Sequence, residues 1–161
     1  MLTTTDPNIR PVTPNDLPAL KAVIDGTGLF PAELLDEMIA PFFAKSHAGD
    51  FWLTYQTEQP IAVAYFAPER LTSGTYNLYL IAVHPDYQSR GIGAALLQHI
   101  EQFLRERGER ILLVETSGLP AFERTRAFYQ QNAYVVEARI REFYAAGEDK
   151  IVFWKALTLP E

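Results

Sequence analysis

Apolar residues follow two spacings along this chain, one typical of strands and the other typical of helices. Aromatic and β-branched residues dominate three extended stretches between residues 51 and 85, and turn residues at 57–60 and 69–74 separate these stretches. This pattern predicts a meander of three strands. A shorter run at 9–12 predicts one strand before the meander.

Apolar residues three and four positions apart predict four helices. The polar run TPND at 13–16 can cap a helix over about 17–24, and Gly26 and Gly28 are expected to end that helix. Pro41 should interfere with the second helix. The helices that follow the first are predicted at about 34–42, 91–107 and 122–131.

The second half of the chain predicts a parallel unit followed by a hairpin. A buried strand is expected at 111–116, close enough behind the third helix to form a right-handed βαβ unit. Two strands at 134–145 and 150–157, joined around Gly147, form a hairpin-like finish. The order βααβββαβαββ predicts the α/β class, with a mixed sheet and helices on both faces. Since no repeat or linker interrupts it, we expect a single domain over residues 1–161.

Composition and charge exclude several classes of function. The 161 residues are 48% hydrophobic, which is enough for one buried core. A net charge of −6 opposes a phosphate backbone, so we expect no nucleic-acid partner. The chain has no cysteine, and its three histidines have no acidic partner at metal-ligand spacing, so we expect no metal.

No apolar run in the sequence is long enough for a membrane span, and the N-terminal residues lack the features of a signal peptide. We therefore expect a cytoplasmic protein without a membrane partner. A homodimer stays open.

Two glycines stand in the first turn of the predicted third helix, within VHPDYQSRGIGAALL at 83–97. Each glycine inside a helix costs about 0.5–1 kcal/mol relative to alanine. Unpaired N–H groups at a helix start bind anions, and glycine lets a bulky anion approach them. Alternatively, Gly91 provides a positive φ and Gly93 allows close packing of the helix on a strand. The spacing fits neither a Rossmann fingerprint nor a P-loop.

Two segments match a known pair of motifs in kind and in spacing. Gln88-Ser89-Arg90-Gly91-Ile92-Gly93 stands between a strand that ends in V-H-P and an amphipathic helix, and it is similar to a Q/R-x-x-G-x-G/A signature. The segment from Ala127 to Tyr134 is similar to an A-x-x-Y-x-x-x-G-F stretch. Both are motifs of the GCN5-related N-acetyltransferase (GNAT) family. The chain thus resembles this family over about residues 77–134, and the remaining element order agrees with the family fold.

The resemblance implies an enzyme that transfers an acetyl group from acetyl-CoA to a primary amine by direct attack in a ternary complex. Backbone amides of the loop and helix start would hold the pyrophosphate, and Arg90 would add a cationic contact or simply face solvent. A bulge in the preceding strand, whose place the sequence does not specify, would turn an N–H, that of Val83 by position, toward the thioester carbonyl. The implied cofactor-binding residues are Ile81, Ala82, Val83, Gln88, Ser89, Arg90, Gly91, Ile92, Gly93 and Ala94.

The resemblance also implies a proton donor. Tyr129 matches the family tyrosine that protonates the departing CoA thiolate, and a phenol with an ordinary pKa of about 10 is protonated at neutral pH. The alternative is a core aromatic that covers the sheet. Because Ala133 stands where the family has glycine, Asn132, which tolerates the left-handed conformation, is expected to end the helix instead.

A proton acceptor is harder to assign, because Asn77 stands where histone-type relatives carry a catalytic glutamate. Glu115 is the first candidate, since it lies at the carboxyl end of a predicted buried strand where desolvation favours proton uptake. It can equally be a structural carboxylate bonded to the loop at 116–119. Glu142 and Tyr144 are weaker candidates.

Two further questions stay open at the level of sequence. A domain of the same fold that binds acyl-CoA without turnover, acting as a sensor or interaction module, is the alternative function. The acceptor amine, in a small molecule or a peptide, is not specified by the sequence.

Overall fold

The computed structural model describes residues 6–158, which form two compact units. The first unit runs through Ala67 and includes Tyr79–Phe103, and the second holds Pro68–Leu78 and continues from Leu104. The chain crosses between the units at the end of one strand, within a second strand and within one helix. The division does not test the expectation of a single domain over residues 1–161, which stays a prediction.

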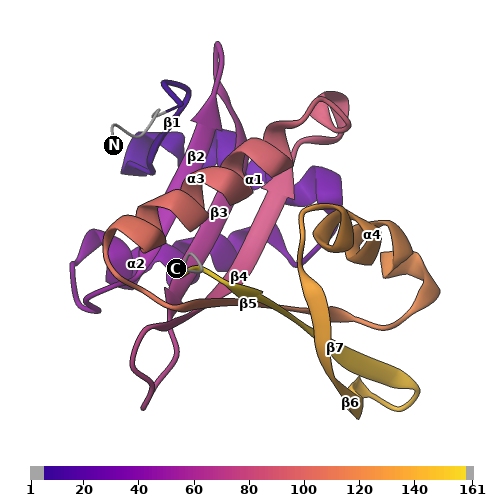
Figure 1. Ribbon diagram of the computed structural model, residues 1–161. Helices are drawn as coiled ribbons and strands as arrows, with labels where there is room; N and C mark the ends of the chain where they lie inside the picture. The colour runs from indigo at the N-terminus through magenta and orange to yellow at the C-terminus, as the bar shows by residue number, and fades with distance from the viewer. Residues whose placement is uncertain (1–5, 159–161) are drawn as a thin grey trace. The chain divides into compact units, whose positions relative to one another are not determined.

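The first unit is built from antiparallel strands and three helices. Its elements are β1 (Ile9–Pro11), α1 (Leu17–Thr27), α2 (Leu35–Phe43), β2 (Phe51–Gln56), and most of β3 (Pro60–Pro68), β4 (Thr75–Val83) and α3 (Ile92–Glu106). Short 3-10 helices lie at Pro14–Asp16, Ala32–Leu34 and Pro85–Tyr87. The strand order is β1-β2-β3-β4. Helices α1 and α2 lie over one face of these strands and α3 crosses the other (Figure 1).

Alternation along the strands divides the apolar side chains of the first unit between its two faces. Trp52 is paired with Tyr65, so the neighbouring pair, Phe51 and Phe66, points to the opposite face. Trp52 lies in a buried cluster with residues of α1 and α2, whereas Phe51 and Phe66 both pack on Phe103 of α3. Both faces of these strands are apolar, and each is therefore covered by helix.

The second unit combines a parallel strand pair with an antiparallel hairpin. Besides the first half of β4 it contains β5 (Ile111–Ser117), a 3-10 helix at Pro120–Phe122, α4 (Glu123–Gln131), β6 (Val135–Ala145) and β7 (Glu148–Ala156). Strand β4 pairs with β5 in parallel, which confirms the predicted βαβ unit, and β6 pairs with β7 in antiparallel orientation. The full strand order, β1-β2-β3-β4-β5-β7-β6, confirms the predicted mixed sheet.

Gly26 does not end the first helix, and that expectation was wrong. Helix α1 continues through Gly26 to Thr27, and Gly28, with a φ of 67°, forms the left-handed cap. A β-carbon at Gly26 would lie 2.7 Å from Cδ of Pro85, so glycine permits a close approach between α1 and the loop after β4. Pro41 also lies inside its helix, α2, without ending it.

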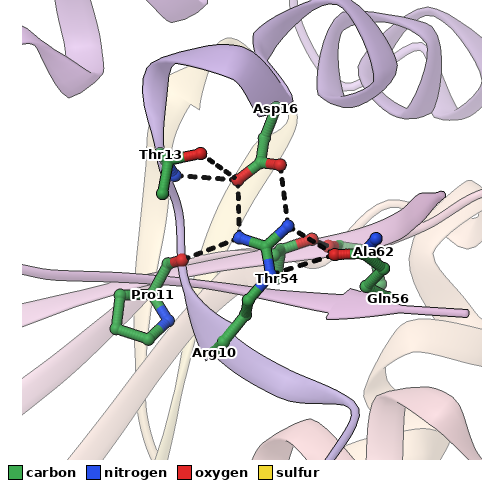
Figure 2. Close-up of polar contacts among 7 residues, drawn as sticks. All are labelled: Arg10, Pro11, Thr13, Asp16, Thr54, Gln56 and Ala62. Carbon is green, nitrogen blue, oxygen red and sulfur yellow. Dashed lines mark hydrogen bonds and ion pairs between the residues drawn. The ribbon is translucent and has the colours of Figure 1, made fainter.

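An ion pair ties β1 to the start of α1 (Figure 2). The Arg10 guanidinium donates to both carboxylate oxygens of Asp16 at 2.8 Å, and it also donates to the Pro11 carbonyl and the Gln56 side chain. The same carboxylate accepts the backbone N–H and the hydroxyl of Thr13, as a capping residue does. The hydrogen bonds from Arg10, opposed by desolvation, lower the pKa of Asp16.

We expect Asp16→Asn to lower the free energy of unfolding by about 1–3 kcal/mol at pH 7, because Arg10 loses its charged partner. The pKa of Asp16 is lowered in the folded state, so its contribution is complete above the unfolded pKa of about 3.9. It is lost as the pH falls from there through the folded value. Urea denaturation at pH 7 and at about pH 2.5 should therefore show a smaller difference between the two proteins in acid.

The matched control is Asp36→Asn, which removes the exposed ion pair of Lys21 and Asp36. This variant should lose less than about 0.5 kcal/mol. Equal losses in the two variants would contradict the role assigned to the Arg10–Asp16 pair.

Candidate functional site

Strand β4 contains a bulge at Tyr79 and Leu80. The His84 N–H donates to the Ile61 carbonyl at 2.8 Å, and counting back along the antiparallel pair places Leu80 opposite Tyr65. The Tyr79 ring stacks on the Tyr65 ring with 5.4 Å between centroids, so Tyr79 lies on that side of the strand as well. Two consecutive side chains on one side are the mark of a β-bulge. The bulge therefore lies upstream of Val83, the residue whose N–H the resemblance singled out.

Beyond the bulge, the backbone groups of Ile81 and Val83 point away from β3, because they alternate with the residues that pair with it. The side-chain amide of Gln88 donates to the Val83 carbonyl at 3.0 Å, and this bond lies on the same outer edge. The described ladder between β4 and β5 joins Thr75–Leu78 to 111–114 and ends before this segment. The Val83 N–H thus points outward, and its role at a thioester carbonyl stays a prediction.

The turn between β4 and α3 contains two left-handed residues. Ser89 has a φ of 63° and Gly91 a φ of 82°, with Arg90 between them. Alternating conformations of this kind turn successive N–H groups to one side and form an anion-binding concavity. The Ala95 N–H donates to the Gly91 carbonyl at 3.0 Å, so Gly91 is the residue before the first helical turn. A helix offers no internal acceptor to the N–H groups of that residue and of the next three, 92–94.

Local contacts hold the loop that leads into this turn. The Nδ1 atom of His84 accepts the Asp86 N–H at 3.1 Å, and the Arg90 guanidinium lies 5.3 Å from the centre of the Tyr87 ring. A β-carbon at Gly91 would meet no atom within 4 Å. The positive φ, and not crowding within the chain, is therefore what requires glycine at this position.

Tyr129 lies on α4, with its ring packed inside the second unit. It is 3% exposed, and its ring contacts those of Phe128, Tyr134 and Phe153. Burial raises the pKa of Tyr129 above its ordinary value, so the phenol stays protonated throughout the neutral range. Phe153 is the register partner of Val114, which places Tyr129 on the face of the sheet that carries Val114.

Asn132 caps the end of α4 as expected, but Ala133 takes the left-handed position, so the expected conformation of Asn132 was wrong. Ala133 has a φ of 71°, whereas Asn132 has a φ of −100° and its side-chain amide donates to the Phe128 carbonyl at 2.8 Å. The N–H groups of Ala133 and Tyr134 donate to carbonyls of the last helical turn, in the pattern of a Schellman motif. The motif fixes which residue is left-handed by its distance from the helix end, even where that residue is alanine.

Glu115 lies on the opposite face of the same sheet from Tyr129, because side chains alternate along β5 and Val114 is its neighbour. Its carboxylate is 3.0 Å from Nζ of Lys150. Lys150 is only 9% exposed, and its ammonium also lies 3.8 Å from the centre of the Phe143 ring. The partner of Glu115 is thus a buried lysine of β7.

The weaker candidates lie on the hairpin of β6 and β7. Glu142 has a φ of 52°, its carboxylate accepts the Gly147 N–H at 3.0 Å, and its own N–H donates to Asp149 at 2.9 Å. These bonds involve both the carboxylate and the backbone N–H of Glu142, and they stabilise the hairpin. Burial, followed by the charges of Glu115 and of the nearby residue 148, raises the pKa of Tyr144.

Asn77 shares the face of Glu115, because it is aligned with Leu113 and Leu113 alternates with Val114. It is 1% exposed, and its Nδ2 donates to the carboxylate of Glu69 at 2.9 Å. This bond fixes the orientation of the amide and leaves Oδ1 buried without a hydrogen-bond partner in the described part of the chain. We call the face that carries Asn77, Leu113, Glu115 and Lys150 the Glu115 face.

Sequence and fold both match one family. The model of the Acetyltransferase (GNAT) family matches residues 22–134. The chain belongs to this family. The ribosomal protein bS18 alanine N-acetyltransferase of Escherichia coli strain K12 is 35% identical over 104 residues, which cover 65% of this chain and 68% of that protein.

Solved structures show the same relationship. A GNAT-family protein from Desulfovibrio desulfuricans has a TM-score of 0.86 and 32% identity, over 93% of this chain and 98% of that chain. A Salmonella typhimurium acetyltransferase solved with acetyl-CoA shares the fold, with a TM-score of 0.75 and 17% identity over 95% of each chain. The family confirms the resemblance carried by the two motifs and makes the protein an acetyl-CoA-dependent N-acetyltransferase.

The predicted site residues fall into two groups. Those predicted to bind the cofactor, at 81–83 and 88–94, lie together in the first unit, and Tyr129 and Glu115 lie in the second. Lys150 and Glu69 were missed, because a partner brought by another segment of the chain leaves no local signal in the sequence. Between residues 6 and 158, no three or more His, Asp or Glu side chains are grouped so that they could hold a metal ion. No helix of this part of the chain is long and apolar enough to cross a membrane.

We expect Ala133→Gly to raise the free energy of unfolding by about 0.5–1 kcal/mol, because glycine adopts a positive φ without the penalty that alanine carries. Urea denaturation measures the change. The reverse variant is Gly108→Ala, at a φ of 81° in open space, which should lose about 1 kcal/mol. A change of the same sign in both variants would contradict this conformational account.

Proposed function

We propose that this enzyme acetylates the amine of an alanine residue in a protein or peptide. The observation that carries the proposal is the run of outward backbone N–H groups in the first unit, from Ile81 and Val83 of β4 to the left-handed turn and the start of α3. Such a run suits a long, partly anionic ligand of the acetyl-CoA type. The named Escherichia coli relative supports the choice of acceptor.

In this proposal, acetyl-CoA lies along β4 and ends at the turn. Ile81 and Val83 pair with its amides, and the Val83 N–H polarises the thioester carbonyl and stabilises the tetrahedral oxyanion. The N–H groups of Gly91 and of residues 92–94 hold the diphosphate. Arg90, which packs on Tyr87 and is exposed, adds positive charge beside them.

The acid and the base of the proposal stand on opposite faces of one sheet. The amine nitrogen attacks the thioester carbon, a C–N bond forms, and the C–S bond breaks. Glu115 accepts a proton from the amine, and Tyr129 gives its hydroxyl proton to the departing CoA sulfur and regains one from solvent.

We expect Tyr129→Phe to lower kcat by about a hundredfold, because the thiolate would leave without its proton donor. The ring contacts with Phe153 and Tyr134 are kept, so the fold and the affinity for CoA should not change. Release of free CoA with an alanine-terminated peptide measures kcat, and a CoA titration measures binding. Tyr55→Phe, on β2, is the matched control. An unchanged kcat for Tyr129→Phe would exclude it as the donor.

We expect Glu115→Gln to lower kcat/KM for the peptide at least about tenfold at neutral pH, with the KM for acetyl-CoA unchanged. A higher pH should restore part of the rate, because an α-amine with a pKa of about 8 then loses its proton in solution. Glu69→Gln is the comparison, since its amide oxygen still accepts from Asn77. A loss in Glu69→Gln with none in Glu115→Gln would assign the proton acceptor to Glu69.

The surroundings of the enzyme are part of the same proposal. We place it in the cytoplasm, without a nucleic-acid, membrane or metal partner, and the net charge of −6 supports the first of these exclusions. A homodimer is compatible with the proposal. A gel-filtration measurement with light scattering gives the oligomeric state directly.

A further inference from the structure

Three aromatic rings form a continuous stack across β2, β3 and β4 of the first unit. The Trp52 and Tyr65 rings are nearly parallel, with 4.4 Å between centroids, and the Tyr79 ring follows at 5.4 Å. The first ring is 1% exposed, whereas Tyr79 is 50% exposed. The contact with the Tyr65 ring, which in turn packs on the buried Trp52, therefore fixes the orientation of Tyr79. Half of the Tyr79 residue is exposed at the surface.

Tyr79 is the first residue of the bulge, and its ring lies on the side of Tyr65. Two positions separate Tyr79 from Asn77, so the regular alternation before the bulge puts both side chains on one face of β4. Ile81 and Val83, whose outward backbone edge is the proposed place of the thioester, follow within four residues.

A carboxylate reinforces the electron-rich character of this stack. Burial, followed by the neighbouring charge of Asp50, raises the pKa of Tyr65. The Asp50 side chain is 15% exposed. The face of an aromatic ring attracts cations, and a nearby carboxylate adds to that attraction.

We propose that Tyr79 is a specificity-determining residue that receives the ammonium group of the acceptor by a cation–π contact, before the amine loses its proton. This inference rests on the proposed function. It names the form in which the acceptor first binds, an alkylammonium ion, and the ring that recognises it. Tyr65 and Asp50 act through Tyr79 as positioning residues.

Two peptide probes test the recognition of charge. A peptide whose N-terminal alanine is trimethylated keeps the positive charge and cannot be acetylated, and the same peptide with a tert-butyl group in place of the trimethylammonium is its neutral isostere. Each is measured as a competitive inhibitor against the unmodified alanine-terminated peptide. The unsubstituted enzyme should bind the charged probe about threefold to thirtyfold more tightly than the neutral one.

Substitutions at Tyr79 decide the outcome. Tyr79→Phe keeps the ring and should keep the preference, whereas Tyr79→Leu keeps apolar bulk and should lose it, with the KM for acetyl-CoA unchanged. Tyr55→Leu, which removes a tyrosine from β2, is the matched control and should keep the preference. An equal preference in Tyr79→Leu and the unsubstituted enzyme would overturn the inference, as would no preference in the unsubstituted enzyme. Absence of acetyl transfer to any amine would instead refute the proposed function.

Discussion

Strand β4 has to meet two demands that conflict in a regular strand. It must pair with β3 on one edge, and it must leave the other edge of its second half open for a ligand. The bulge at Tyr79 and Leu80 lets the strand do both. The extra residue exchanges the residues, odd-numbered or even-numbered, whose backbone groups point toward β3. The outward N–H groups of Ile81 and Val83 follow from that exchange.

The open edge and the turn after it are complementary in what they offer. A strand edge presents N–H and C=O groups alternately and suits an extended chain with amides of its own. The turn with Ser89 and Gly91 left-handed, followed by a helix start, presents N–H groups alone and suits an anion. A ligand with an amide arm and a diphosphate, such as acetyl-CoA, uses both in sequence. The Gln88 side chain joins the two by its bond to the Val83 carbonyl.

Two ion pairs of the fold have different consequences. Arg10 and Asp16 form a bidentate pair that also caps a helix, so its main effect is on stability. Lys150 is mostly buried and holds Glu115 by a contact of 3.0 Å. A buried cation is costly without its counter-charge, so the main effect of this second pair is to hold the Glu115 carboxylate in place on the Glu115 face.

Local patterns were enough to determine most of the elements, and they supplied most of the site residues of the proposal. Periodicity predicted the strands and helices, the two glycines predicted an anion-binding turn, and motif spacing singled out Tyr129, because all of these depend on residues close in sequence. Only the tertiary structure decided the bulge in β4, the pairing of Glu115 with Lys150 and of Asn77 with Glu69, and the left-handed conformation of Ala133. Strand register and the exact end of a helix depend on packing between distant segments, and a one-residue change in either moves a side chain to the other face without changing the sequence pattern.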